Sequence, residues 1–166
     1  MRSLANSSAG AEPPASADGA NCLQVHVDEG LPLPGVLAQL IDHVAAAVHD
    51  HTNMTGVVGL RLTDDAEMAR LNAAFAGKPW ATDVLAFPSG DPQYPGDVAI
   101  SLERVRSQAT AYGHRIEREF GYLLTHGLLH LAGFGHDDGA EQRQMRRVEE
   151  SVMAVVGLAR DHKPVR

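Results

Sequence analysis

Apolar residues recur along the first third of the chain with two spacings, one typical of strands and one typical of helices. Residues 23–28 alternate between apolar and polar side chains, and residues 55–62 are apolar and β-branched, so both segments predict strands. Between them, residues 35–50 carry apolar side chains three and four positions apart, which predicts an amphipathic helix. The pattern therefore begins as strand, helix, strand.

Capping residues predict where three further helices begin. Asp64, Ser101 and Asp138 each precede a segment with helical periodicity, and their side-chain oxygens can accept hydrogen bonds from first-turn N–H groups. These helices are predicted to run to about residue 76, from 102 to about 112, and to Gly157. Another helix, before the last of these, carries His126 and His130.

Two short strands are predicted ahead of the helix that Ser101 caps. Residues 82–88 predict a third strand that ends at Pro88, and residues 96–101 predict a fourth. Residues 89–95 are rich in Gly and Pro and predict a loop between these strands. Because the two strands are close in sequence, we expect them to pair antiparallel.

The order of these elements predicts the fold class. We expect a single α/β (α+β) domain with a mixed four-stranded sheet covered by about five helices. The domain is expected to span 21–160. Residues 1–20 are rich in Ser, Ala, Gly and Pro and predict a disordered N-terminal tail, and residues 161–166 predict a short C-terminal tail.

Three histidines near the end of the chain form the strongest chemical signal. His126 and His130 are four residues apart, so on a helix they lie one turn above the other on the same face. Gly133 can take the left-handed conformation that ends a helix, which would let the chain fold back and bring His136 beside them. Three imidazoles leave a fourth position of a tetrahedral zinc ion open to water, as in catalytic zinc sites.

Zinc is the expected cofactor, one ion per chain, although imidazole ligands also suit nickel, copper or iron(II). A zinc-bound water has a pKa near 7, so hydroxide would be available at neutral pH. The histidine spacing is similar to the long zinc-protease signature, but Gly127 stands where those enzymes place a glutamate general base. The sequence therefore disfavours peptide hydrolysis.

Composition and net charge limit the classes of partner that the protein can be expected to bind. The net charge of −7 opposes non-specific binding to duplex DNA, so no DNA partner is expected, and an RNA substrate would need a local basic patch, a bound metal or a partner protein. The lone Cys22 excludes an internal disulfide and suits the cytoplasm. No apolar run approaches the length of a membrane span, so no membrane partner is expected.

A few further residues are candidates for the site. Glu119 and Tyr122 lie on the predicted face of His126 and could orient the imidazoles, although a solvated Glu and a half-buried Tyr are the alternative. Lys78, in the loop before the third strand, could meet a phosphate, although an isolated Lys is usually only solvated.

Arginines cluster modestly on two predicted helical regions, interspersed with acids. We interpret both regions as solvated helix faces. The basic members are Arg104, Arg106, Arg115, Arg118, Arg143, Arg146 and Arg147, and the acids among them include Glu119 and Glu149.

Three blocks of sequence resemble the YbeY family of bacterial rRNA-maturation endoribonucleases, over residues 55–157. The first is Leu71-Asn72 with 82–88, which reads TDVLAFP. The second is Gly96-Asp97 with Ile100-Ser101. The third, 126–136, reads HGLLHLAGFGH and follows the family pattern His-Gly-x-Leu-His-Leu-x-Gly-Tyr-Asp-His closely.

The resemblance implies a zinc-protease-like metal helix in a mixed α/β domain, with a metal held by His126, His130 and His136. It implies cleavage of single-stranded RNA, maturation of the small-subunit rRNA 3′ end and ribosome quality control. The expected partners are ribosomal RNA, the small ribosomal subunit and its assembly factors. His126 and Lys78 are then candidate catalytic residues, and Lys78 and Thr82 candidate RNA contacts.

The chain departs from the family pattern at two places. Ala76 stands where the family usually carries an Arg that is thought to assist catalysis, and Phe134-Gly135 replaces the Tyr-Asp before the third histidine. Two other functions therefore stay open: a ribosome-assembly binding factor with a mainly structural metal, and a metallopeptidase, which Gly127 disfavours.

Overall fold

The computed structural model describes residues 21–135 and 137–160, which form a four-stranded sheet and five helices. The predicted tails, 1–20 and 161–166, and His136 lie outside the described residues. The elements in chain order are β1 (Leu23–Val27), α1 (Gly35–Thr52), β2 (Gly56–Thr63), α2 (Asp65–Ala76), β3 (Val84–Asp91), β4 (Tyr94–Ser101), α3 (Leu102–Tyr112), α4 (Ile116–Leu131) and α5 (Gly139–Val155). The mixed sheet with five helices is the predicted fold class.

The sheet has the strand order β1-β2-β4-β3. β1 pairs with β2 and β2 pairs with β4 in parallel, while β3 pairs with β4 antiparallel, as predicted from their closeness in sequence. β3 is therefore an edge strand, and β4 lies between it and β2.

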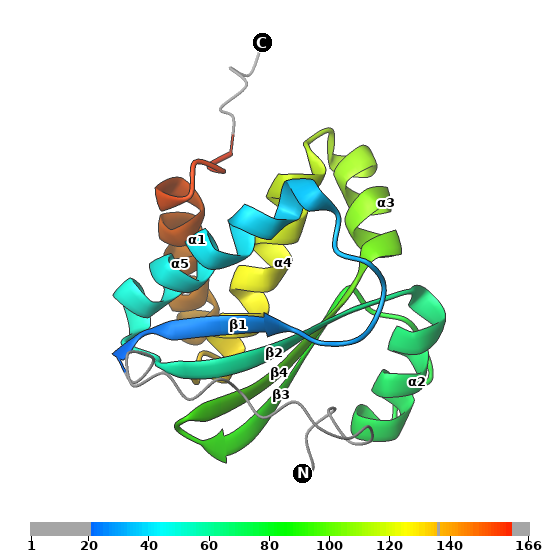
Figure 1. Ribbon diagram of the computed structural model, residues 1–166, viewed down its shortest axis with the longest axis horizontal. Helices are drawn as coiled ribbons and strands as arrows, with labels where there is room; N and C mark the ends of the chain where they lie inside the picture. The colour runs from blue at the N-terminus through cyan, green and yellow to red at the C-terminus, as the bar shows by residue number, and fades with distance from the viewer. Residues whose placement is uncertain (1–20, 136, 161–166) are drawn as a thin grey trace.

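Helices cover the two faces of the sheet unequally. α1, α3, α4 and α5 lie on one side, with α1 in front of α4 in the view of Figure 1, and α2 lies on the other side near one end. The main core is formed between the sheet and the first group, where alternate strand residues such as Leu60, Val98 and Ile100 are fully buried against Phe120 and Leu128. α4 runs through this core and contacts α1, α3, α5, β3 and β4.

A second, smaller core lies on the face that α2 covers. Met68 and Leu71 of α2 pack on Ala99, with Leu85 and Phe87 of β3 beside them. Phe75 adds an edge-to-face contact with Phe87, the ring centroids being 4.9 Å apart. β3 thus contributes to both faces, which fixes the edge strand between α4 and α2.

The predicted caps form as expected. Asp64 Oδ1 accepts from the N–H of Glu67 at 2.8 Å, and Ser101 Oγ accepts from the N–H of Arg104 at 3.2 Å. Asp138 Oδ1 accepts from the N–H groups of Ala140 and Glu141, both at 2.8 Å. These helices begin where the side-chain chemistry of the sequence indicated.

The prediction of a loop over 89–95 was wrong, because β3 continues to Asp91 and β4 already begins at Tyr94. The N–H of Ser101 donates to the carbonyl of Asp83 at 3.0 Å, which fixes the hydrogen-bonding pattern between the two strands. In this pattern the backbone N–H and C=O groups of residues 85 and 87 point toward β4, and those of the residues between and after them, including Pro88, point away from β4. The nitrogen of Pro88 therefore points to the free edge, where a missing N–H breaks no pairing.

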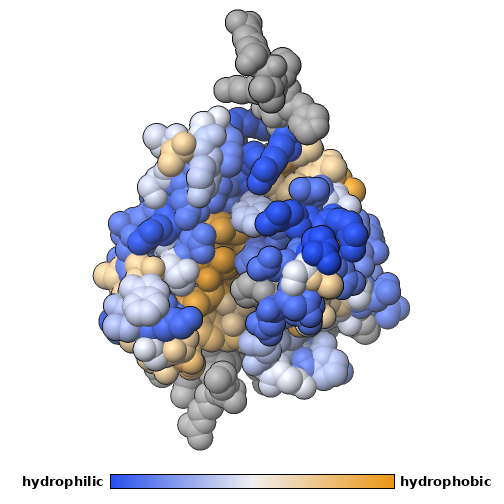
Figure 2. Space-filling model, turned by 180° about the vertical axis from the view of Figure 1, so that it is seen from behind, coloured by the Kyte–Doolittle hydropathy of each residue, from blue (hydrophilic) through white to orange (hydrophobic). Residues whose placement is uncertain are grey.

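The surface seen from behind is mostly hydrophilic. Figure 2 shows one hollow near the middle of this view with an apolar floor between hydrophilic flanks. Of the described helices, none is both long and apolar enough to cross a bilayer.

Candidate metal centre

His126 and His130 lie one above the other on α4, one turn apart. Their Nε2 atoms are 3.1 Å from each other, and the ring centroids are 4.6 Å apart with the ring planes at 78°. Both side chains are partly buried. The two imidazoles therefore turn the same nitrogen toward one point.

The end of α4 reverses the chain directly after this pair. The N–H of Phe134 donates to the carbonyl of Leu129 at 3.0 Å, and the N–H of Gly133 donates to that of His130 at 3.1 Å, which is a Schellman motif. Gly133 has φ +97°, the left-handed conformation predicted for it. The helix thus stops within one turn of His130, and the chain changes direction at Gly133.

Glu149 of α5 orients the first histidine. Its Oε1 lies 2.6 Å from Nδ1 of His126, and only 6% of Glu149 is exposed. Tyr122, one turn before His126 on α4, hydrogen-bonds to the same carboxylate and places its ring centroid 6.0 Å from that of His126. Burial, followed by the charge of Glu149, raises the pKa of Tyr122 to about 12, so its hydroxyl keeps its proton and can donate to Glu149.

Gly127 lets α4 approach the sheet closely. A Cβ at this position would lie 2.7 Å from Cγ1 of Val98 and 3.3 Å from Cγ2 of Val84. A side chain at 127 would therefore collide with β4 and β3 rather than reach the histidines. The glutamate that zinc peptidases place at this position has no room here.

The donor set fits a divalent metal ion. Two nitrogens that are each about 2.05 Å from a tetrahedral zinc are separated by about 3.3 Å, close to the 3.1 Å between the two Nε2 atoms. A carboxylate on the opposite ring nitrogen, as Glu149 provides, is the usual partner of a metal-binding histidine. Within 21–135 and 137–160 no group of three metal-binding side chains is found, and the third predicted ligand, His136, lies outside those ranges.

Glu119 and Tyr122, predicted to orient the imidazoles, have different partners. Tyr122 reaches His126 through Glu149, as described above. Glu119 is buried and its Oε2 lies 2.7 Å from Nε2 of His114, in the turn between α3 and α4. Its side chain therefore orients His114, and the role of holding His126 belongs to Glu149.

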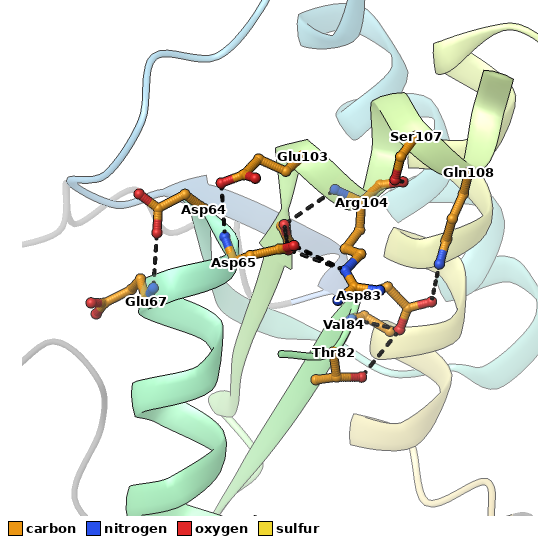
Figure 3. Close-up of polar contacts among 11 residues, drawn as sticks. Asp64, Asp65, Glu67, Thr82, Asp83, Val84, Glu103, Arg104, Ser107 and Gln108 are labelled. Atoms are coloured by element: carbon orange, nitrogen blue, oxygen red, sulfur yellow. Dashed lines mark hydrogen bonds and ion pairs between the residues drawn. The ribbon is translucent and has the colours of Figure 1, made fainter. Parts of the chain in front are cut away.

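Thr82 and Asp83 lie where the loop after α2 enters β3 (Figure 3). Asp83 accepts from its neighbours, through Oδ1 from the N–H of Val84 at 2.8 Å and through Oδ2 from Gln108 of α3 at 3.3 Å. The Thr82 hydroxyl donates to Asp83 at 3.5 Å. The charge of Asp83 also acts on Tyr122, which places the start of β3 near the histidine face of α4.

Lys78 is exposed just beyond α2, where its backbone N–H donates to the carbonyl of Asn72 at 3.2 Å. Among the contacts of the described residues, none joins Lys78 to the histidine pair. A role for Lys78 or Thr82 toward RNA stays a prediction.

Glu149 was the residue that sequence reasoning missed, because it was interpreted as part of a solvated helix face. A signal was present in the pattern of α5. The apolar residues Met145, Val148 and Val152 define its buried stripe, and position 149 falls on that stripe. A carboxylate at a buried position requires a partner, and the partner is His126.

Known proteins resemble this chain over most of its length. The family model described as Endoribonuclease YbeY matches residues 32–157. A protein of that name from Chloroflexus aurantiacus is 40% identical over 153 residues, covering 84% of this chain and 97% of the relative. Another from Desulfitobacterium hafniense is 41% identical over 140 residues, covering 76% and 89%.

The fold also matches a solved structure. The solution structure of TM1509 from Thermotoga maritima superimposes with a TM-score of 0.55 over 86% of this chain and 99% of that chain, at 21% sequence identity. At this identity the match concerns the fold.

Proposed function

The chain belongs to the YbeY family of endoribonucleases, and from this membership and the geometry of α4 we propose that it is a metal-dependent endoribonuclease that cleaves single-stranded RNA. The substrate we propose is ribosomal RNA, with a role in maturation of the small-subunit rRNA 3′ end and in ribosome quality control. The partners would then be the small ribosomal subunit and its assembly factors, in the cytoplasm.

The observation that carries this proposal is the paired orientation of His126 and His130. Their Nε2 atoms face one point, and Glu149 holds His126 through its other ring nitrogen. We expect these two histidines, with His136, to hold one zinc ion. When bound, a divalent ion there supplies charge stabilisation at a phosphate or a water of lowered pKa.

The remaining residues would position the RNA strand and the imidazoles. Glu149 and the protonated hydroxyl of Tyr122 would hold the ring of His126 in one orientation during cleavage. Lys78 and Thr82 are the proposed contacts to RNA phosphates. An RNA strand also brings its own nucleophile, the 2′-hydroxyl beside the scissile phosphate, so the chain does not require a glutamate at position 127.

The test is RNA cleavage by purified protein with zinc, compared with His130→Ala. We expect the variant to lose cleavage and bound zinc together. His43→Ala removes an exposed histidine of α1 and serves as the matched control, which should cleave as the wild type does. Cleavage by His130→Ala at the wild-type rate would exclude a metal-centred mechanism.

A ribosome-assembly binding factor with a structural metal is the second candidate. The net charge of −7 and Ala76 at the position of the family's usual Arg favour it. Chelation separates the two functions: loss of cleavage with an unchanged circular dichroism spectrum favours catalysis, whereas unfolding favours a structural metal.

A further inference from the structure

A cavity of about 510 Å³ lies at the turn between α3 and α4, on the N-terminal side of the histidine pair. Its volume is within the range of about 300–1,000 Å³ that small-molecule sites occupy. The lining side chains that matter here are Tyr112, His114, Arg118, Glu119, Tyr122 and Arg160. They come from the end of α3, the turn, the first two turns of α4 and the segment after α5.

The charge of this cavity is opposite to that of the chain. Arg118 and Arg160 contribute two positive charges, and Glu119 contributes one negative charge, which is engaged with His114 at 2.7 Å. The lining is therefore positive by one charge without counting His114, in a protein whose net charge is −7. A concave positive site on an acidic protein favours an anionic ligand.

The side chain of Arg118 is already fixed in position by a contact within the protein. Its guanidinium donates to the carbonyl of Leu158, which ties the arginine to the segment after α5. A guanidinium fixed in this way loses less conformational freedom when it binds a phosphate.

The cavity also presents an aromatic ring at its rim. Tyr112 is the last residue of α3 and is 67% exposed, although a tyrosine gains free energy by burial. Its ring centroid lies 5.7 Å from that of His114, with the planes at 44°. An exposed ring beside cationic side chains is the usual arrangement for stacking a base of a single-stranded nucleic acid.

Tyr122 joins the cavity to the histidine pair. It lines the cavity and contacts Glu149, which holds His126. Glu119 and His126 are seven residues apart on one face of α4, roughly 10 Å along the helix axis. Neighbouring nucleotides of a single strand can therefore occupy the cavity and the histidine site together.

We propose that this cavity binds one nucleotide of the RNA strand, with the base stacked on Tyr112 and a phosphate on Arg118 and Arg160. The proposal rests on the proposed function, because the strand concerned is the one that the histidine site would cut. It assigns a binding role to Arg118, which the sequence pattern placed on a solvated helix face.

The experiment measures binding separately from cleavage. A fluorescent single-stranded oligoribonucleotide with 2′-O-methyl riboses is titrated with the protein as purified, and anisotropy gives Kd at several salt concentrations. A gel after each titration verifies that the strand is intact. The variants are Tyr112→Leu, Tyr112→Phe and Arg160→Gln, which all change exposed side chains. The control is Arg70→Gln, the same change of charge on α2, which packs on the other face of the sheet.

The expected results differ for each variant. Tyr112→Leu raises Kd roughly fivefold or more because it removes the stacking surface, and Tyr112→Phe restores wild-type affinity because it keeps the ring. Arg160→Gln lowers the slope of log K against log salt by about 0.7, the contribution of one phosphate contact to a single strand. Arg70→Gln leaves that slope unchanged.

The proposal is overturned if Tyr112→Leu and Arg160→Gln bind with the affinity and salt slope of the wild type or of Arg70→Gln. It is also overturned if the wild type does not bind the strand at all. A protein that binds RNA through this cavity but never cleaves an unmodified strand would contradict the proposed function and leave the cavity assignment standing.

Discussion

Glu149 of α5 and His126 of α4 are in direct contact, with Oε1 of the carboxylate 2.6 Å from Nδ1 of the imidazole. The contact is almost entirely buried on the glutamate side and leaves Nε2 of His126 facing His130. A metal-binding imidazole whose other nitrogen is fixed in this way has one tautomer and one orientation.

Replacing Glu149 by glutamine should weaken metal binding while the fold persists. Loss of the carboxylate loosens the orientation of His126, and loss of such a partner typically lowers metal affinity roughly 10- to 100-fold. Competition for zinc between the protein and a chromophoric chelator measures this. Glu150→Gln, at the exposed neighbouring position, is the matched control, and equal affinities of the two variants would contradict the assignment.

Tyr122 should make the stability of the protein depend on alkaline pH. Its pKa is about 12 in the folded protein against 10.0 for the free side chain, so the unfolded chain releases this proton first. The contribution of Tyr122 to stability is fully present below pH 10 and is lost as the pH rises toward 12. Urea unfolding in this interval should show a steeper fall for the wild type than for Tyr122→Phe, and equal slopes would contradict the prediction.

Gly127→Ala should destabilise the protein, although alanine favours helices. The helix gains about 1 kcal/mol from the substitution, while crowding in a packed core typically costs about 1–3 kcal/mol. The crowded group is Val98, which is fully buried. We expect a net loss of about 1 kcal/mol in the free energy of unfolding, seen as a fall of roughly 2–4 °C in the thermal midpoint.

Two controls separate crowding from helix propensity. Gly35→Ala, at the start of α1, adds a Cβ that has no neighbour within 4 Å, and it should not destabilise. Combining Gly127→Ala with Val98→Ala should cost less than the sum of the two single losses, because the smaller residue accepts the new methyl group. Strict additivity would show that Val98 is not the obstacle.

Asp28→Asn should stabilise the protein at neutral pH. Burial, followed by the charge of Asp97, raises the pKa of Asp28 above 3.8, while His26 and Arg61 act in the other direction. The folded state therefore holds this proton more tightly than the unfolded chain, and stability falls as the pH rises through the folded pKa. The gain from asparagine should be present at pH 7 and vanish below pH 3.8, as urea unfolding at both pH values measures. The exposed Asp42→Asn is the control, and a larger gain for it would contradict the prediction.

Local chemistry explains which parts of the fold could be predicted. The caps Asp64, Ser101 and Asp138 and the terminating Gly133 act on the backbone within a few residues, so their signals are readable in sequence. The helix that carries His126 and His130 has no side-chain cap at its start, and only its end, at Gly133, follows from the same kind of signal. Each of these predictions was confirmed.

The errors arose where a distant part of the chain decides the outcome. Pro88 ends a strand only if its nitrogen faces a partner, and the sequence does not state that β3 is an edge strand. Glu149 is 23 residues from His126, and its pairing depends on how α5 crosses α4. Glu119 is on the predicted face of α4 but is close enough to His114 to bind it instead.

The contact between α4 and α5 also has a consequence for biosynthesis. The sheet and its first three helices are complete in the nascent polypeptide before residue 113, whereas the carboxylate that steadies His126 is translated 23 residues after it. A ribosome-bound intermediate can therefore form the sheet and the first three helices while His126 still lacks its contact with Glu149. If the histidines cut RNA, the order of translation would delay full activity until residue 149 has been translated and α5 has packed on α4.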